Sequence, residues 1–361
     1  MKKILLGLGV LVVLGVGVVI VGHPSAQKGS VSLGVIAGVT GDYAAAGEGY
    51  VKGFELAREE WNKSHALQFE AVFEDDGFNA QKGVAAYNKI KSVDKPDAYA
   101  IVSSFTIDAI ADNLHQEGLP VALGFEQGVA ATDDNIFQVF PAARPIMEGL
   151  GKQEKSDGYK KPLVLFSNNS PVYQNFVAGF VDGYGEDVVK EVISGTDGNT
   201  IRAAATRALA DRPDSINFFM DPPAGALLAK EILLQSKGNH PPFVFDQSIQ
   251  SGKPDYEKVF GKGLAALDES MVVLSRNDLT QDFKTLYKNK YQSEPPFGAD
   301  IGYNSFELLA STYASSPQTW IKNMKQADFV GADGKVLFNQ VGLRVPNLAF
   351  GTLKNGEVVL P

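Results

Sequence analysis

The sequence predicts an α/β protein with two doubly wound parallel-sheet lobes, and three observations support this prediction. Beyond Ser30, short β-rich segments alternate with single stretches of helical periodicity. This alternation is typical of right-handed βαβ crossovers, which build parallel sheets covered by helices on both faces. Roughly nine such strands in about 330 residues exceed one ordinary domain. A chain of 361 residues that is 44% hydrophobic can also fill two cores.

The strands and helices are predicted from apolar or alternating runs and from windows of helical periodicity. The predicted strands are 31–37, 67–73, 98–102, 120–124, 163–166, 188–193, 215–220, 242–245 and 271–274. The predicted helices are 49–61, 80–90, 108–116, 173–180, 200–209, 225–234, 281–291, 298–313 and 318–326. From Phe329 onward the chain is β-rich, and the segment "GADGKV" predicts a tight turn between two strands.

The N-terminal segment has the pattern of an export signal. Two lysines precede an uncharged run over residues 4–22, which exceeds the usual apolar region of a signal and reaches the length of a membrane span. Cleavage after Ala26 would place Pro24 where a small residue is preferred. We therefore expect residues 1–27 to form either a cleaved signal peptide or an apolar helix retained as a membrane anchor. The anchor is favoured, with the rest of the chain outside the cytoplasm.

The composition argues against several partners and chemistries. The formal net charge of the chain is −9, which is unfavourable for nucleic acid or an anionic membrane surface as the main partner. Cysteine is absent, so the chain has no disulfide, no thiolate metal ligand and no cysteine nucleophile. Because of the net negative charge, nucleic acid is not expected as a partner.

The sequence lacks the common signatures of catalysis and cofactor binding. It contains no GxxxxGK[ST] motif, no GxGxxG between a predicted strand and a helix, and no GxSxG. None of its four histidines pairs with another at metal-ligand spacing. The acidic segment "EDDG", residues 74–77, could form a phosphoacceptor or metal site, but a solvated turn after a strand is favoured. We therefore predict a protein that is not an enzyme and holds no metal or cofactor.

Polar and aromatic residues follow several predicted strands, at the sheet edge where parallel sheets bind ligands. Such ligands sit beyond the carboxyl ends of the strands, where helix N-termini present their amides. Each joint alone is typical of a helix cap or an ordinary loop. Six together would line both walls of a cleft between two sheets. The candidate ligand-binding residues in these joints are Tyr43, Ser103, Ser104, Thr106, Glu126, Gln127, Tyr173, Asp221, Asp246 and Gln247.

Most of the chain from Val31 onward resembles the type I periplasmic binding proteins, in particular the branched-chain amino acid class of ABC-transporter substrate-binding proteins. The segment "GVIAGVTGDYAAAGEGYVKGFELAREEWN" looks like the opening strand, ligand loop and first helix of that family. The segment "FEDDGFNAQKGVAAYNKI" is similar to its next strand and helix. In "IVSSFTIDAIADNLHQEGLPVA", as in the family, a serine/threonine cluster precedes a helix. The order of these segments along the chain makes the resemblance specific.

The resemblance implies two discontinuous lobes with a ligand trapped in the cleft between them. Three crossovers would join the lobes, near Phe140, Leu274 and Phe329. The first lobe would comprise residues 31–140 and 275–329, and the second lobe residues 141–274 and 330–361.

The resemblance also implies roles for single residues. Ser103 falls where a serine of the family holds the carboxylate of a bound amino acid, and Thr106 belongs to the same turn. Tyr173 falls where a tyrosine of the second lobe covers the ligand. On this basis, both lobes contribute to the pocket.

Three positions depart from the family's pattern. Where the family has a small pair and a threonine that bind the carboxylate, this chain has Glu126, Gln127 and Gly128. The second aromatic contact of the family falls at Asp221 or Pro222. The glutamate that receives the ammonium falls at Gln247, with Asp246 adjacent. A carboxylate at Glu126 would repel an acidic ligand and suit a cationic, amide or polyol ligand.

We therefore predict an extracytoplasmic solute-binding protein that delivers a small polar solute, amino-acid or amide-like, to an ABC-transporter membrane permease. A membrane tether through residues 4–22 is part of this prediction. Two alternatives stay open. The same lobes could act as a sensor that reports its ligand to a membrane partner, although the chain has no signalling domain and no second long apolar run. An enzyme on this fold is disfavoured by the missing catalytic groups.

Overall fold

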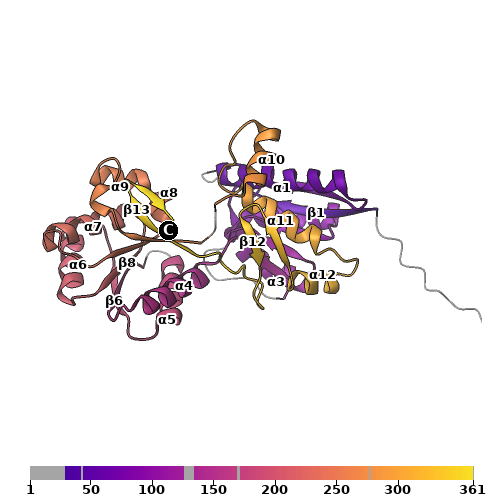
Figure 1. Ribbon diagram of the computed structural model, residues 1–361. Helices are drawn as coiled ribbons and strands as arrows, with labels where there is room; N and C mark the ends of the chain where they lie inside the picture. The colour runs from indigo at the N-terminus through magenta and orange to yellow at the C-terminus, as the bar shows by residue number, and fades with distance from the viewer. Residues whose placement is uncertain (1–28, 42–43, 126–133, 169–170, 276–277, 361) are drawn as a thin grey trace, which may run out of the picture.

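The computed structural model describes residues 29–41, 44–125, 134–168, 171–275 and 278–360. Two bodies, each a β-sheet flanked by helices, lie side by side in Figure 1. The predicted apolar helix of residues 1–27 lies outside the described residues, as do the candidate site residues Tyr43, Glu126 and Gln127.

The first lobe is built on a five-stranded parallel sheet with the order β2-β1-β3-β4-β5. Its strands are β1 (Ser30–Ile36), β2 (Gln68–Glu74), β3 (Ala98–Ile101), β4 (Val121–Leu123) and β5 (Ile136–Gln138). Its helices are α1 (Ala44–Ser64), α2 (Ala80–Lys89), α3 (Ser104–Glu117), α10 (Gln281–Tyr291), α11 (Ala299–Ser311) and α12 (Pro317–Met324). One face of the sheet packs on α1 and α11, and the other packs on α2 and α3. Because the five strands are parallel, their carboxyl ends meet at one edge of the sheet.

The second lobe is built on a seven-stranded sheet with the order β14-β13-β10-β9-β8-β6-β7. Its strands are β6 (Pro162–Ser167), β7 (Val189–Ile193), β8 (Ser215–Phe219), β9 (Phe243–Asp246), β10 (Met271–Leu274), β13 (Ala349–Lys354) and β14 (Glu357–Val359). Its helices are α4 (Ala143–Asp157), α5 (Pro171–Tyr184), α6 (Gly198–Ala210), α7 (Pro222–Ser236), α8 (Ser248–Ser251) and α9 (Lys253–Phe260). The pair β13 and β14 is antiparallel at the edge, so this sheet is mixed rather than purely parallel.

All nine predicted strands are present, because buried parallel strands are apolar runs bounded by turn residues. The strand β5 and the helices α4, α8 and α9 were not predicted. The strand β5 has only three residues, "IFQ". In α4, Gly149 and Gly151 interrupt the helical pattern. The glycines pack closely, since a Cβ on Gly151 would lie 2.3 Å from the carbonyl oxygen of Phe180 in α5.

A close glycine contact explains why a late segment belongs to the first lobe. A Cβ on Gly53 of α1 would lie 1.8 Å from the carbonyl oxygen of Ala299. A Cβ on Gly302 of α11 would lie 1.9 Å from the carbonyl oxygen of Tyr50. Because both helices present glycine at their contact, their backbones can touch. The first lobe is therefore assembled from two distant parts of the chain.

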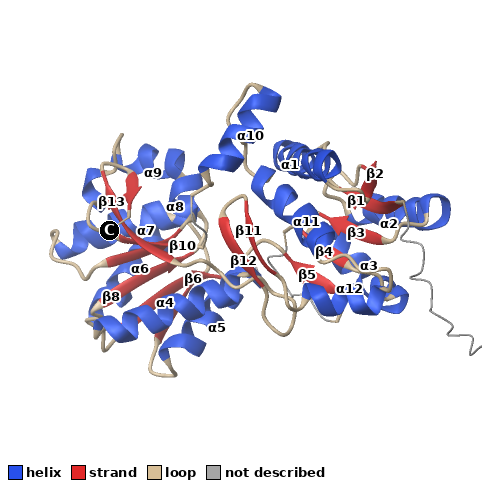
Figure 2. Cartoon of the chain, turned by 45° about the vertical axis from the view of Figure 1, so that its right-hand side comes forward, coloured by secondary structure: helices blue, strands red, loops and turns tan. Residues whose placement is uncertain are grey.

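The chain passes between the lobes three times, and the third passage differs from the prediction. The connecting segments are 139–142, 275–280 and 338–348. The third was expected near Phe329, but the hairpin of β11 (Asp328–Gly331) and β12 (Gly334–Leu337) stays with the first lobe, beside α11 in Figure 2. The predicted turn in "GADGKV" is present within it.

Two contacts hold this hairpin on the first lobe. The amide of Ala332 donates to Oδ1 of Asn304 in α11 at 2.7 Å. Phe329 and Phe338 pack against the core of the first lobe. The assignment of residues 330–361 to the second lobe is therefore wrong for residues 330–337, and the chain enters the second sheet only at Ala349.

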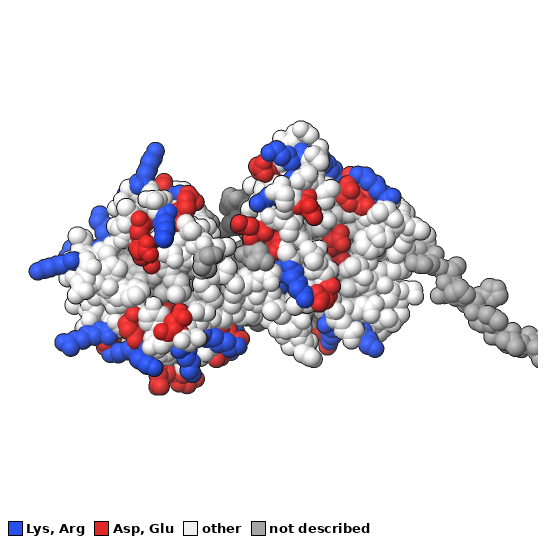
Figure 3. Space-filling model, viewed as in Figure 1, with Lys and Arg blue, Asp and Glu red and all other residues white. Residues whose placement is uncertain are grey.

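Within the ranges the structure describes, no helix is both long enough and apolar enough to cross a membrane. The same residues contain no group of three or more His, Cys, Asp and Glu side chains placed to hold a metal ion. On the face seen in Figure 3, lysine and arginine alternate with aspartate and glutamate over both lobes.

Candidate ligand-binding site

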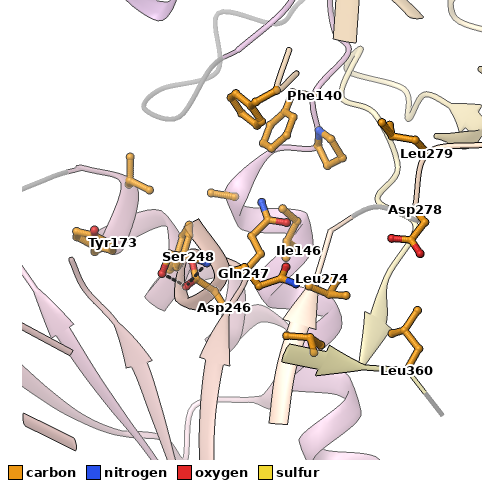
Figure 4. A pocket seen from close by; sticks show the side chains of 17 residues that line it. Phe140, Ile146, Tyr173, Asp246, Gln247, Ser248, Leu274, Asp278, Leu279 and Leu360 are labelled. Atoms are coloured by element: carbon orange, nitrogen blue, oxygen red, sulfur yellow. Dashed lines mark hydrogen bonds between the residues drawn. The ribbon is translucent and has the colours of Figure 1, made fainter. Parts of the chain in front are cut away.

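A cavity of about 690 Å³ lies between the two lobes. Its volume falls within the range of small-molecule sites, about 300 to 1,000 Å³. Figure 4 shows the side chains that line it. From the first lobe and the crossovers, they include Phe140, Pro141, Asp278, Leu279 and Phe297. From the second lobe, they include Ile146, Tyr173, Phe176, Asp246, Gln247 and Leu274.

Tyr173 forms part of the second-lobe wall from the first turn of α5. Its hydroxyl donates to Oδ1 of Asp221, at the start of α7, over 2.7 Å. Its ring packs edge to face on Phe176 at 5.9 Å between centroids, and Phe176 packs in the same way on Phe219 at 5.6 Å. Burial, with the hydrogen bond and charge of Asp221, raises the pKa of Tyr173, so the hydroxyl stays protonated at neutral pH. The ring is thus held in one position by the core of its lobe.

Asp246 lies on the same wall, at the end of β9, and is 7% exposed. Its Oδ1 accepts hydrogen bonds from the amide of Ser248, at 3.1 Å, and from the hydroxyl of Ser248 (Figure 4). Burial raises the pKa of Asp246 to about 6, although the hydrogen bonds from Ser248 act in the opposite direction. A cationic ligand group beside this carboxylate would favour its ionised form.

Gln247 connects the cavity wall to the second crossover. Its Oε1 accepts a hydrogen bond from the hydroxyl of Ser275 at 2.7 Å and one from the amide of Ser275 at 3.4 Å. Ser275 is 1% exposed and directly follows β10. Because Oε1 faces Ser275, the amide NH₂ of Gln247 is the part of this side chain that can donate to a ligand.

The wall on the first-lobe side is aromatic. Phe297, which precedes α11, is 54% exposed. Its ring stacks on Phe125 at 5.3 Å between centroids with an interplanar angle of 27°. Phe125 in turn packs on Phe140 at 5.5 Å. This wall can bury an apolar group of a ligand, and such contacts favour binding by removing apolar surface from water.

Ser103, Ser104 and Thr106 are not among the residues that line the cavity. Ser103 is the N-cap of α3, and its Oγ accepts a hydrogen bond from the amide of Thr106 at 3.3 Å. Thr106 is fully buried, and its hydroxyl donates to Oδ2 of Asp76 at 2.5 Å. The hydroxyl of Ser103 thus caps α3, and the hydroxyl of Thr106 ties the first turn of α3 to the loop that follows β2.

The turn "EDDG" was predicted to be solvated, and this is wrong for Asp76, which is 0% exposed. Its carboxylate accepts the hydrogen bond from Thr106. The neighbouring Asp75 is exposed, and it accepts hydrogen bonds from the amide of Val39 at 2.9 Å and the hydroxyl of Thr40 at 2.6 Å. The two carboxylates therefore join the loops that follow β1, β2 and β3 at the edge of the first sheet.

The described lining of the cavity carries carboxylates but no lysine, arginine or histidine. Asp246 belongs to the second lobe and Asp278 to the second crossover. Asp221 adds a third carboxylate behind the hydroxyl of Tyr173. A cavity lined by one sign of charge attracts the opposite sign.

Several lining residues were not predicted as site residues. Phe140 and Leu274 were predicted only as positions of crossovers, and Phe297 and Asp278 had no role. The location of the crossovers was the one available signal, since segments that join two lobes run past the cleft between them. Phe297 follows two prolines, which predicts a turn but gives no indication of a ligand.

An open cavity that lies between two α/β lobes and is lined from both is typical of a protein that binds small molecules. Residues 30–357 match the family described as periplasmic binding protein. The chain therefore belongs to the periplasmic binding protein family, and the predicted resemblance is confirmed. This family is a class of binding proteins, in agreement with the prediction that the chain is not an enzyme.

Solved structures of similar fold cover nearly the whole chain. A leucine-binding protein from Thermotoga maritima is 18% identical, with a TM-score of 0.68 over 92% of this chain and 97% of that one. A putative branched-chain amino acid ABC transporter protein from Rhodospirillum rubrum is 14% identical, with a TM-score of 0.76 over 92% and 100% of the two chains. A solute-binding protein from R. palustris, in complex with benzoate, is 19% identical, with a TM-score of 0.64 over 92% and 95%. These identities establish the fold.

A similar curated protein is the Leu/Ile/Val-binding protein homolog 3 of Brucella melitensis biotype 1. It is 30% identical over 123 residues, which is 33% of this chain and 33% of that relative. The similarity therefore spans about a third of either protein.

Proposed function

We propose that this chain is an extracytoplasmic solute-binding protein, which traps a small amino-acid or amide-like solute between its lobes and delivers it to an ABC-transporter permease. The cavity lined from both lobes is the observation that carries this proposal. The three connecting segments act as the hinge about which the lobes close. The names of the similar proteins, which refer to leucine, branched-chain amino acids and benzoate, support a small organic solute.

Closure of the two lobes follows from the binding free energy that a small solute requires. A solute of about nine heavy atoms gains at most roughly 1.5 kcal/mol per atom, or about 13 kcal/mol, whereas micromolar affinity requires about 8 kcal/mol. Most of that maximum is needed, so the solute must be almost fully enclosed. At roughly 30 Å³ per heavy atom, the volume of a liquid water, such a solute fills less than half of the cavity. Closing of the lobes supplies the missing contacts.

The walls define the chemistry of the proposed solute. Phe297 and Phe140 suit an apolar group, whereas Asp246 and the amide of Gln247 suit an amine or an amide. Tyr173 covers the solute from the second lobe. A solute whose only polar group is a carboxylate would face Asp246 without a compensating cation in the described lining.

The remaining candidate residues follow strands of the first sheet, and we propose that they contribute to the site from the edge of that sheet. Tyr43, Glu126 and Gln127 are proposed to approach the solute from the loops that follow β1 and β4. Ser103, Ser104 and Thr106 begin α3 at the same edge. We propose that the amides of this helix start face the solute's polar end when the lobes close.

Native mass spectrometry of the protein purified from its own source tests the proposal. The expected result is a bound small molecule that carries an amine or amide and is released on unfolding. Calorimetry with a panel of amino acids, amides, amines and carboxylates then ranks the classes. If no member of the panel binds and no small molecule copurifies, the proposal is wrong.

Two alternatives are separated by simple observations. Copurification with a permease distinguishes delivery from a sensor that reports to another membrane partner. Turnover of a bound solute would indicate an enzyme. The proposed tether through residues 4–22 is checked by the intact mass of the exported protein, since a mature chain that begins near Gln27 excludes the tether.

A further inference from the structure

A buried ion pair lies where the crossovers meet the first lobe. Arg344 and Asp333 have side chains that are 1% and 0% exposed, and Nη2 of Arg344 lies 2.9 Å from Oδ1 of Asp333. Asp333 is in the turn between β11 and β12. Asn304 of α11 binds this turn through two hydrogen bonds. Its Nδ2 donates to Oδ1 of Asp333 at 2.8 Å, and its Oδ1 accepts from the amide of Ala332 at 2.7 Å. The turn is thus fixed to the first lobe.

The third crossover is bonded at this point to the end of β5 and to the first residue of the first crossover. The amide of Arg344 donates to the carbonyl of Gln138 at 3.1 Å, and the amide of Gln138 donates to the carbonyl of Gly342 at 2.8 Å. Nη1 of Arg344 donates to the carbonyl of Val139 at 3.4 Å. Through Asp333, both crossovers are therefore connected to the hairpin turn.

The second crossover ends at the same turn. The amide of Thr280 donates to the carbonyl of Ala332 at 2.8 Å. The hydroxyl oxygen of Thr280 accepts from the amide of Phe283 at 3.3 Å, which makes Thr280 the N-cap of α10. The hairpin turn thus contacts the second crossover directly and is connected to the other two through Arg344.

Contacts with the second lobe begin only a few residues beyond this anchor. Leu348 packs with the core of the second lobe, and a Cβ on Gly149 of α4 would lie 1.8 Å from its Cδ1. Three residues separate Arg344 from Leu348. In the first crossover, Phe140 packs with the first lobe and Ala143 with the second. The backbone that can bend without breaking these contacts is therefore short.

The ion pair is not optimised for stability alone. Nε of Arg344 and Oδ2 of Asp333 are buried and have no hydrogen-bond partner among the described residues. A buried ion pair with unsatisfied atoms is often replaceable by apolar residues without loss of stability. A role in fixing position accounts for its presence at a junction of three chain segments.

We infer that Arg344 and Asp333 act as positioning residues, which clamp the first and third crossovers to the Ala332–Asp333 turn that also holds the second crossover, and so fix the axis about which the lobes move. The clamp lies outside the cavity lining and does not depend on the identity of the solute. It confines bending to the residues between the clamp and the second lobe. Loss of the clamp would let the lobes adopt a wider range of relative positions.

Double electron–electron resonance between the lobes tests this inference. The chain has no cysteine, so spin labels can be placed at Gln116→Cys in the first lobe and Lys190→Cys in the second, both on exposed positions. Arg344→Met with Asp333→Leu replaces the pair by apolar side chains. The solute-free distance distribution is expected to become about twofold broader in this variant.

Two further variants make the result decisive. Ser215→Ala removes a buried hydrogen bond, 2.8 Å to Oε2 of Glu154, between the start of β8 and α4, and its distribution is expected to keep the parent width. Arg344→Lys keeps the charge but loses the guanidinium bond to Val139, and an intermediate width is expected. The parent width in a folded double variant overturns the inference. If the double variant does not fold, the parent width in Arg344→Lys overturns it equally.

Discussion

The hydroxyl of Tyr173 donates a hydrogen bond of 2.7 Å to Oδ1 of Asp221, across the edge of the second sheet. Both residues follow strands of that sheet, and Tyr173 lines the cavity while Asp221 stands behind it. The bond fixes the ring in the wall and leaves the hydroxyl oxygen free to accept one hydrogen bond. The wall is thus organised before any solute arrives, which reduces the entropy cost of binding.

Two substitutions of Tyr173 separate the ring from the hydroxyl. Tyr173→Phe keeps the ring but removes the bond to Asp221, and we expect affinity to fall by about 0.5 to 1.5 kcal/mol. Tyr173→Ala opens the wall to water as well, so it is expected to cost more. Calorimetry with the copurifying solute measures both. Equal affinity in Tyr173→Ala and the parent would place the solute elsewhere.

The pKa of Asp246 predicts how solute binding depends on pH. Because burial raises this pKa to about 6, the carboxylate is ionised above pH 6 and becomes protonated below it. An amine binds to the ionised form, so its affinity should fall about tenfold per pH unit below pH 6 and level off above it. Asp246→Asn should abolish this dependence and weaken an amine strongly, while a neutral amide is nearly unaffected. Affinity that rises on acidification would contradict an amine at this position.

Ser103 offers a test of the first-lobe part of the proposed site. Its Oγ caps α3 through the amide of Thr106, so Ser103→Ala is expected to lower the free energy of unfolding by about 1 kcal/mol. Ser103→Asn keeps a capping oxygen and should restore stability. If the serine hydroxyl also donates to the solute, affinity falls in both variants. Reduced stability with unchanged affinity would restrict Ser103 to its role as a cap.

Glu154 predicts how stability depends on pH. It is fully buried in α4, its Oε2 accepts from Ser215, and burial raises its pKa to about 7. The ordinary pKa of a glutamate, which applies to the unfolded chain, is 4.5. The folded state therefore binds the proton more tightly, so this residue's favourable contribution is complete below pH 4.5 and is lost as the pH rises to about 7.

The neutral substitution Glu154→Gln should remove that loss and raise the free energy of unfolding at pH 8 by up to about 3 kcal/mol. At pH 4 the variant and the parent should be similar. Denaturant unfolding at the two pH values gives the comparison. A variant that is less stable than the parent at pH 8 would show that Glu154 is held ionised by its surroundings.

Local patterns predicted the strands and three residues of the second-lobe cavity wall, whereas long-range pairs were not predictable. Tyr173, Asp246 and Gln247 were identified because each follows a strand at the edge where ligands bind. The burial of Asp76 depends on Thr106, 30 residues later, and the position of the β11–β12 hairpin depends on Asn304. Neither partner is marked by spacing, since a turn with aspartate is normally solvated. Phe297 joins the cavity only through the packing of α11 on α1.

Small-angle X-ray scattering of the solute-free and solute-saturated protein is the most direct test of trapping between two lobes. The solute is the one identified by native mass spectrometry, and its binding is confirmed by calorimetry in the same buffer. Because the cavity is larger than a solute of about nine heavy atoms needs, closure should lower the radius of gyration on saturation. A saturated protein with an unchanged radius of gyration would contradict closure of the lobes around the solute.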